Sequence, residues 1–189
     1  MSTLPADPTR ATLVELADAI AARRISSLEI TQACIARAKA LQPALNAFIL
    51  LEEEKALAAA KAADAVPTGG KLHGVPLAHK DMYYRAGRVA TCGSKIRRDW
   101  VAPVTATALA RLDAAGAIDL GTLNLAEFAF GPTGHNWHFG HTRNPWNTAH
   151  ITGGSSAGSG AATAARIVFG ALGSDTGGSI RMPAFCNGL

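Results

Sequence analysis

Apolar residues recur at helical spacing twice near the start of the chain, and each run follows a helix-capping pattern. Thr12 with Glu15, and Ser26 with Glu29, have the spacing of a capping box, in which each residue's side chain bonds to the backbone N–H of the other. This spacing predicts two amphipathic helices that begin directly after Thr12 and Ser26. We expect the second helix to end at Pro43, because proline lacks an N–H group and disrupts a helix interior.

Short apolar runs alternate with helical patterns along the middle of the chain. This alternation is typical of a sheet with largely parallel strands and with helices on its faces. Lys80 and Asp81 follow a predicted buried strand, and Gly116 is expected to terminate a helix. The predicted elements are a strand over 47–51, a helix over 52–65, a turn over 67–70, a strand over 75–79, a helix over 105–115 and a strand over 118–122.

From Gly131 the sequence becomes rich in Gly, Ser, Thr and Asn, although apolar segments still interrupt it. We interpret this part of the chain as its functional half rather than as a linker. The stretch 149–152 has a strand-like pattern, and 159–167 predicts a helix of small residues whose backbone can approach its neighbours closely. Two clusters rich in glycine and serine, at 153–160 and 173–181, are the candidates for chemistry.

Composition narrows the class of protein. The chain has 189 residues, of which 48% are hydrophobic and 17% charged; this excludes a disordered polar chain and allows one domain with a substantial core. The net charge of +4 is spread thinly along the sequence, so we expect no direct contact with nucleic acid. No apolar run approaches the ~20 residues that span a bilayer, and the first residues lack a signal-peptide pattern. We therefore expect a cytoplasmic location and no membrane partner.

Metal and disulfide sites have little support in the sequence. The three cysteines are far apart and form no C-x-x-C pair, which predicts buried free thiols. Three histidines are spaced i, i+3 and i+6, but no carboxylate accompanies them in the sequence and the neighbouring glycines predict a loop. We expect no metal and no cofactor. The three cysteines are Cys34, Cys92 and Cys186, and the three histidines are His135, His138 and His141.

The cluster at 153–160 is compatible with four interpretations. A phosphate-binding loop has weak support, because the chain contains no Gly-Lys-Ser/Thr triplet. Residues 154–158 match the G-x-S-x-G pattern of α/β-hydrolases, but that triad needs a histidine further along the chain and none follows His150. The other two interpretations are a serine–lysine hydrolase and tight turns without chemistry.

The cluster at 173–181 favours the serine–lysine hydrolase. Glycines directly before Ser179 allow successive backbone N–H groups to point into one concavity, as an oxyanion hole requires. Ser179 would then be the nucleophile, and Lys80, at the end of an apolar strand, is the upstream candidate for its base. To act near pH 7.5, Lys80 needs a pKa lowered by about three units, which burial can supply.

Three stretches closely resemble the amidase signature family: 74–81, 153–156, and 173–181 together with Pro183 and Ala184. The resemblance covers nearly all of the chain. It implies an α/β fold in which a mixed β-sheet is sandwiched between α-helices. Two departures from the family's pattern are visible, Ala157 and Asn187, where glycine is the usual residue.

The resemblance also implies roles for individual residues. Carried over by motif position, Ser179 is the acyl-forming nucleophile, Ser155 is the bridging serine and Lys80 is the base, with a cis peptide bond between Gly154 and Ser155. The oxyanion hole would consist of the N–H groups of Thr176, Gly177, Gly178 and Ser179. Ser156 and Asp175 are expected to support this machinery, Asp175 by fixing the glycine-rich turn with hydrogen bonds.

The implied activity is hydrolysis of a carboxamide, through a serine acyl-enzyme, to a carboxylate and ammonia or an amine. Members of the family are more than twice as long as this chain. We therefore expect residues 1–189 to be the N-terminal part of a single domain whose fold is incomplete at the C-terminus. Within this part we expect a helical segment at 1–66 and the signature core at 67–189. One alternative is the glutaminase subunit of a tRNA-dependent amidotransferase, which needs partner subunits. Another is a non-catalytic truncated fragment. The expected partner is otherwise a small-molecule amide, and a homo-oligomer is a further option.

Overall fold

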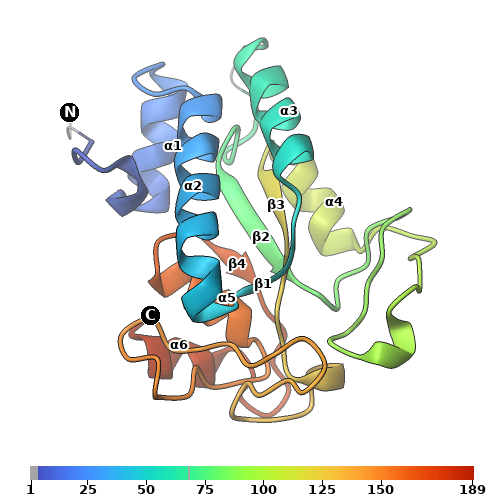
Figure 1. Cartoon of the computed structure of the whole chain (residues 1–189). Coiled ribbons are helices and arrows are strands. Elements are labelled where there is room, and N and C mark those ends of the chain that lie inside the picture. Colours follow the sequence, from blue (N-terminus) through green and yellow to red (C-terminus); the bar gives the residue numbers. More distant parts are fainter. Residues whose placement is uncertain (1–3, 68) are drawn as a thin grey trace.

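The computed structural model describes residues 4–67 and 69–189 (Figure 1). Thr68, which falls in the predicted turn, lies outside the described residues. The helices and strands, in chain order, are α1 (Leu13–Ala21), α2 (Ser27–Leu45), β1 (Phe48–Leu51), α3 (Glu53–Asp64), β2 (Pro76–Lys80), α4 (Thr107–Ala114), β3 (Ile118–Leu123), α5 (Ala157–Ala164), β4 (Ala171–Leu172) and α6 (Arg181–Asn187). Short 3-10 turns lie at Pro8–Arg10, Lys95–Arg97 and Glu127–Ala129.

Both predicted capping boxes are present and set the starts of the first two helices. Thr12 and Glu15 bond reciprocally at the start of α1, and Ser26 and Glu29 do the same at α2. The predicted end of α2 is wrong, because Pro43 lies inside the helix. Proline removes one N–H donor there, but α2 continues to Leu45. Asn46 caps the helix: its N–H donates to the Gln42 carbonyl, and its left-handed backbone (φ 48°) ends the helix.

The four strands form one mixed sheet in the order β1-β3-β2-β4. β1 pairs antiparallel with β3, whereas β2 runs parallel to both β3 and β4. The predicted α/β fold with a mixed sheet is therefore confirmed. No helix in the described ranges is long and apolar enough to cross a membrane.

The side chains of β2 alternate between two differently packed faces of the sheet. On one face Leu77 and His79 lie beside α4, in a small cavity lined also by Leu109 and Leu112. On the other face the side chain of Lys80 reaches Ser155, at the start of the α5 region. The main core fills the space among α1, α2, α3, α5 and the sheet. Its fully buried members include Leu16, Ile30, Cys34, Val75, Leu120, Leu123, Ala161 and Ile167.

Two predicted elements near the second half of the chain need correction. The strand-like stretch 149–152 is irregular, since Ile151 is 42% exposed and the Thr152 carbonyl accepts a hydrogen bond from the Asn187 side chain rather than from a strand. The predicted helix of small residues is α5, which begins at Ala157 and ends at Ala164 rather than spanning 159–167. Its small residues allow close packing: a Cβ on Gly158 would overlap the Ala47 carbonyl and lie 2.6 Å from the Asn124 nitrogen.

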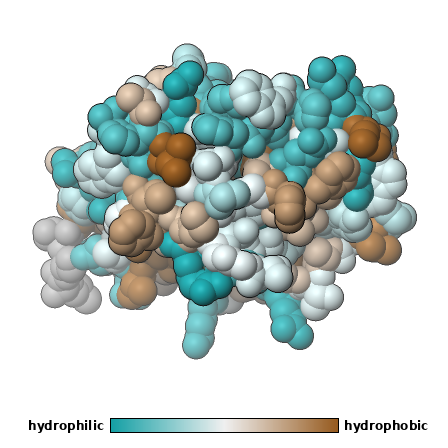
Figure 2. Space-filling view, turned by 90° about the horizontal axis from the view of Figure 1, so that it is seen from below, coloured by the Kyte–Doolittle hydropathy of each residue, from teal (hydrophilic) through white to brown (hydrophobic). Residues whose placement is uncertain are grey.

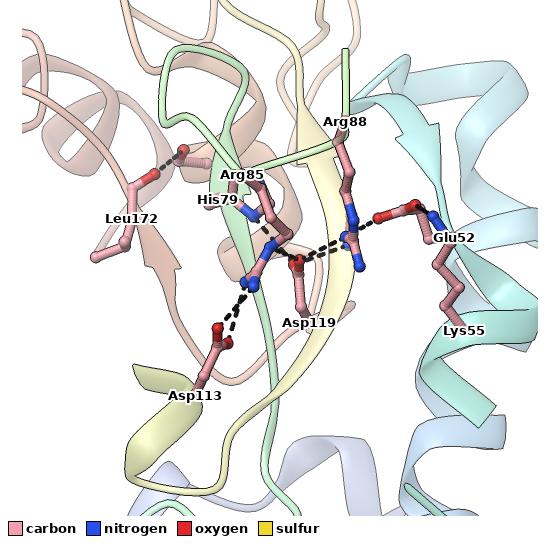
Figure 3. A network of polar contacts seen from close by, with 10 residues as sticks. Glu52, Lys55, His79, Arg85, Arg88, Asp113, Asp119 and Leu172 are labelled. Atoms are coloured by element: carbon pink, nitrogen blue, oxygen red, sulfur yellow. Dashed lines mark hydrogen bonds and ion pairs between the residues drawn. The ribbon is translucent and has the colours of Figure 1, made fainter. Parts of the chain in front are cut away.

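A partly buried ionic network fastens the loop after β2 to the sheet (Figure 3). Asp119 on β3 lies at its centre, 3.0 Å from His79 Nδ1 and 3.0 Å from Arg85 Nε. Arg85 also forms two bonds to Asp113 of α4, at 2.7 and 3.1 Å. Arg88 bridges Asp119 to Glu52 at the start of α3. The network thus attaches the loop that follows Lys80 to three separate elements.

The charge of Asp119 is balanced within this network. Burial raises the pKa of Asp119, but the hydrogen bond from His79 and the charge of Arg85 outweigh burial and hold the pKa below its usual value. Asp119 is therefore ionised at neutral pH, and it shares the compensation of Arg85 with Asp113 and that of Arg88 with Glu52.

Candidate active site

Lys80 is the most deeply placed residue of the candidate site. Its side chain is 0% exposed, and it is the largest of the fully buried side chains. Its Nζ lies 2.6 Å from Ser155 Oγ and 2.8 Å from Ser174 Oγ. Lys80 is the last residue of β2, and every residue of this strand is buried. The strand therefore carries the lysine into the interior.

The environment of Lys80 favours a neutral amine. Burial lowers the pKa of Lys80 from 10.5 to about 8, and the nearby Asp175 and Cys92 only partly oppose this effect. The direction agrees with the expectation for a lysine base. A substantial fraction of Lys80 is therefore unprotonated near pH 8.

Ser155 lies on a loop that two glycines allow to pack very closely. The peptide bond between Gly154 and Ser155 is cis, as predicted. A Cβ on Gly154 would overlap the Gly131 carbonyl and lie 2.6 Å from the Gly134 nitrogen, so no larger residue fits there. Backbone bonds hold the loop on both sides: Gly154 N–H donates to the Pro132 carbonyl at 2.7 Å, and the Ser155 carbonyl accepts from Ala126 at 3.1 Å.

Ser179 lies in the turn that precedes α6, next to the Ser155 loop. Its carbonyl accepts a hydrogen bond from the Ser156 N–H at 3.2 Å. Ser156 Oγ also lies 3.3 Å from both the nitrogen and the carbonyl oxygen of Ser174. Ser156 therefore connects the loop that carries Ser155 to the segment that carries Ser179.

Asp175 organises the turn around Ser179. Its carboxylate accepts hydrogen bonds from the backbone N–H groups of Gly178, Ile180 and Arg181, at 2.8 to 3.2 Å. It also forms two bonds to the Arg181 guanidinium. These bonds, first among them those from the Arg181 side chain, hold the pKa of Asp175 well below its usual value. The geometry is that of a carboxylate that shapes a turn.

The predicted oxyanion-hole donors differ in their availability. Gly178 N–H already donates to Asp175 Oδ1 at 2.8 Å, so it is not available to a substrate in this structure. Thr176 and Gly177 lie in the exposed part of the turn, and a Cβ on Gly177 would contact nothing within 4 Å. Of the four predicted N–H donors, Gly178 is therefore the one whose hydrogen already has an acceptor within the turn.

Two residues of the site were not predicted from the sequence. Ser174 accepts a hydrogen bond from Lys80, and Tyr83 Oη donates to the Gly173 carbonyl at 2.6 Å. Ser174 belongs to the second glycine- and serine-rich cluster, so its membership of that cluster was the available signal. Tyr83 follows Lys80 by three residues and carries no pattern that points to a role.

The cysteines and histidines do not form a metal site in the described part of the chain. No group of three or more His, Cys, Asp or Glu side chains there could hold an ion. The cysteines are free, as predicted, but only Cys34 is buried, whereas Cys92 and Cys186 are partly exposed. Burial raises the pKa of Cys34 to about 12 and also raises the pKa of Cys92. The three histidines lie in a loop, as predicted, but a carboxylate does accompany one of them: Glu127 Oε1 lies 2.9 Å from His138 Nε2.

Comparison with known proteins defines the class of this chain. Residues 29–189 match the family model described as Amidase. Because the match covers well over half of the chain, the protein belongs to the Amidase family. The predicted resemblance is thereby confirmed, and the mixed sheet flanked by helices is the architecture that it shares with solved amidases.

Three similar proteins place the chain within this family. A glutamyl-tRNA(Gln) amidotransferase subunit from Azotobacter vinelandii is 49% identical over 183 residues, which are 95% of this chain and 38% of that protein. The structure of peptide amidase from Stenotrophomonas maltophilia has 35% identity and a TM-score of 0.86, over 93% of this chain and 38% of that one. A structure described as a vestigial protein complex that reveals the evolutionary origins of an s-triazine catabolic enzyme has 42% identity and a TM-score of 0.88, over 92% and 39%. The chain thus spans well under half the length of the relatives it matches.

Proposed function

We propose that the site hydrolyses a carboxamide of a small molecule through a serine acyl-enzyme, with Ser179 as nucleophile, Ser155 as bridging serine and Lys80 as base. The observation that carries this proposal is the contact between the buried Lys80 amine and Ser155 Oγ, at 2.6 Å. A lysine whose pKa burial has lowered to about 8 can act as a base near neutral pH. Membership of the Amidase family supports amide hydrolysis in general.

In the proposed acylation step, neutral Lys80 accepts the proton of Ser155, and Ser155 in turn takes the proton of Ser179. Ser179 Oγ then attacks the amide carbonyl carbon and forms a tetrahedral intermediate. As that intermediate collapses, the C–N bond breaks and the proton returns through Ser155 to the leaving nitrogen. Ammonia or an amine departs, and a water molecule hydrolyses the ester on Ser179.

The oxyanion of the tetrahedral intermediate needs preorganised donors. We assign these to the N–H groups of Thr176, Gly177 and Ser179, whose turn Asp175 holds in shape through its bonds to the following backbone. Removal of one such donor costs other serine hydrolases roughly 10²–10³ in rate. Loss of the Asp175 carboxylate should therefore slow the reaction even though this side chain does not touch the reacting atoms.

A colorimetric assay of ammonia release from simple amides tests the proposal. The wild-type chain should release ammonia, whereas Ser179→Ala should not, and hydroxylamine should trap a hydroxamate with the wild type alone. Lys39→Ala is a matched control for Lys80→Ala, because the side chain of Lys39 is 60% exposed and distant from the site in sequence. Hydroxamate formed at the wild-type rate by Ser179→Ala would refute the nucleophile assignment.

A second candidate function is that of a glutaminase subunit in an amidotransferase. The observation that favours it is the 49% identity to a protein described as a subunit of glutamyl-tRNA(Gln) amidotransferase. In that case glutamine would be the amide, and the activity would depend on partner subunits. Glutaminase activity that appears only when such subunits are added would favour this candidate, and turnover of simple amides by the chain alone would favour the first.

A further inference from the structure

Tyr83 connects the strand that carries Lys80 to the segment that carries Ser174 and Ser179. The backbone turns sharply after Lys80, whose carbonyl accepts hydrogen bonds from the N–H groups of Met82 and Tyr83, at 2.7 and 3.1 Å. This turn fixes Tyr83 relative to the lysine. From there Tyr83 Oη reaches the Gly173 carbonyl at 2.6 Å.

Gly173 is a position where the sheet no longer restrains the chain. β4 ends at Leu172, which pairs with His79, so Gly173 is the first residue beyond the strand pairing. The next residue, Ser174, accepts a hydrogen bond from Lys80 Nζ at 2.8 Å, and its own hydroxyl lies 3.0 Å from Met82 Sδ. The contacts therefore form a closed circuit from Lys80 through Tyr83, Gly173 and Ser174 back to Lys80.

We propose that Tyr83 is a positioning residue, whose hydroxyl holds the Gly173–Ser174 segment against the Lys80 amine and keeps water away from it. This inference rests on the proposed role of Lys80 and adds a residue to it. Tyr83 is half-buried, and nothing else in the described structure donates a side-chain hydrogen bond to the Gly173 carbonyl. Ser156 would still hold the Ser174 backbone, with both contacts at 3.3 Å. Without the Tyr83 hydroxyl, however, the Gly173 carbonyl would lose its 2.6 Å donor, and we expect the segment to loosen and admit water to the amine.

Loss of the Tyr83 hydroxyl should raise the pKa of Lys80. Burial is the main cause of its lowered pKa, and the titratable groups that act on it are Asp175 and Cys92, which raise it. Asp81, the next residue, is buried and bonded to Thr91. Entry of water in a Tyr83→Phe variant would relieve desolvation while leaving these groups in place. The pKa of Lys80 should therefore rise from about 8 towards 10.5, by about one unit or more.

The chain has two tyrosines, and the second provides a matched control. Tyr84 is also half-buried, but its hydroxyl accepts a hydrogen bond from Arg97 Nη1, at 3.0 Å, and its ring packs beside Trp100. Tyr83→Phe and Tyr84→Phe each remove one oxygen atom and keep the ring, so the fold should survive in both. Melting temperatures check this before any comparison.

The decisive measurement is a titration of Lys80 that does not require catalysis. Protein labelled with ¹³C at lysine Cε is followed by NMR between pH 6 and 11, and Lys80→Met identifies the signal. Tyr83→Phe should raise the midpoint by about one unit, and Tyr84→Phe should leave it unchanged. Hydrogen exchange of the amides in 173–181 should be faster in Tyr83→Phe alone. In the ammonia assay, Tyr83→Phe should lower kcat about tenfold with little change in KM and move the pH profile upward.

Three outcomes separate this inference from the proposed function. An unchanged Lys80 titration and unchanged exchange in Tyr83→Phe would overturn the inference, whatever the activity of the protein. Equal changes in both tyrosine variants would also overturn it, because they would show a general effect of losing a hydroxyl. A raised Lys80 midpoint in Tyr83→Phe alone supports the inference even where the wild type hydrolyses no amide, and in that case only the proposed function fails.

Discussion

At the scale of single residues, the buried amine of Lys80 determines the pH dependence that we expect. Burial lowers its pKa from 10.5 to about 8, and the proposed base must be neutral to accept a proton. The rate of acylation should therefore fall about tenfold for each pH unit below about 8 and become constant above it. Initial rates of ammonia release between pH 6 and 10 measure this curve, and a rate that stays constant from pH 8 down to pH 6 would contradict the role of the lysine.

The lowered pKa of Lys80 also makes the stability of the fold depend on pH. Because the folded protein binds the Lys80 proton less tightly than the unfolded chain does, protonation favours unfolding. The stability attached to Lys80 is present above pH 10.5 and is lost as the pH falls towards about 8. This behaviour is the cost of placing an amine where it can act as a base.

At the scale of elements, the small residues of α5 allow its close contact with the sheet. A Cβ on Gly158 would overlap the Ala47 carbonyl and lie 2.6 Å from the Asn124 nitrogen, and both obstacles are backbone atoms. Gly158→Ala should lower the free energy of unfolding by about 2–3 kcal/mol, more than the gain in helix propensity of ~1 kcal/mol. Gly177→Ala is the matched control for stability, since nothing lies within 4 Å of its Cβ. Urea unfolding measures both, and equal midpoints would contradict the packing argument.

The ionic network around Asp119 connects the loop after β2 to the sheet. Asp119→Ala would remove the carboxylate that His79, Arg85 and Arg88 share, although Arg85 keeps Asp113 and Arg88 keeps Glu52. We expect a loss of about 1–3 kcal/mol in the free energy of unfolding. The side chain of Asp113 is 45% exposed, so Asp113→Ala should cost only about 0–1 kcal/mol. Urea denaturation of the two variants compares them directly. Equal losses of unfolding free energy in the two variants would contradict the larger effect that we expect for the more deeply buried Asp119.

Local patterns in the sequence predicted most of the elements, but not the contacts between distant segments. The capping boxes at Thr12 and Ser26 set helix starts through neighbouring residues alone, so they could be predicted. The end of α2 beyond Pro43 could not, because the left-handed residue that completes the helix lies three positions later. The stretch 149–152 has a strand-like pattern but no partner strand, and pairing is a property of the whole sheet.

In the candidate site, too, contacts between distant segments could not be predicted from local patterns in the sequence. Lys80 and Ser155 are 75 residues apart, and their contact was expected from the family resemblance rather than from spacing. Ser174 and Tyr83 contribute single hydroxyl groups that depend on how β4 pairs with β2, which the sequence did not reveal. The bond from Gly178 to Asp175, which removes one predicted oxyanion donor, likewise depends on the shape of the turn.

At the scale of the whole molecule, large apolar side chains are exposed in the part of the chain that follows β3. Phe130 is 91% exposed and Phe185 is 88% exposed, and Trp137 and Trp146 are exposed too. This part of the chain forms the lower end of the molecule in Figure 1, and Figure 2 shows apolar patches beside hydrophilic ones there. Exposed aromatic surface of this kind is a common site of association.

We therefore expect the chain to self-associate as its concentration rises. Sedimentation velocity should show a larger average mass at higher concentration, and a variant that combines Phe130→Ser with Phe185→Ser should reduce this trend. Val14→Ser, on α1, removes a side chain that is 65% exposed and should leave association unchanged. A monomer at all concentrations would contradict this expectation.

The central claim is that Ser179 is the nucleophile and that Lys80 activates it through Ser155. The most direct measurement is peptide mapping by mass spectrometry after reaction with a fluorophosphonate, which labels activated serines covalently. We expect one adduct on Ser179 in the wild type, none in Ser179→Ala, and a much slower reaction in Lys80→Ala at pH 8. An adduct on Ser155 or another residue, or labelling of Ser179 at the same rate without Lys80, would contradict it.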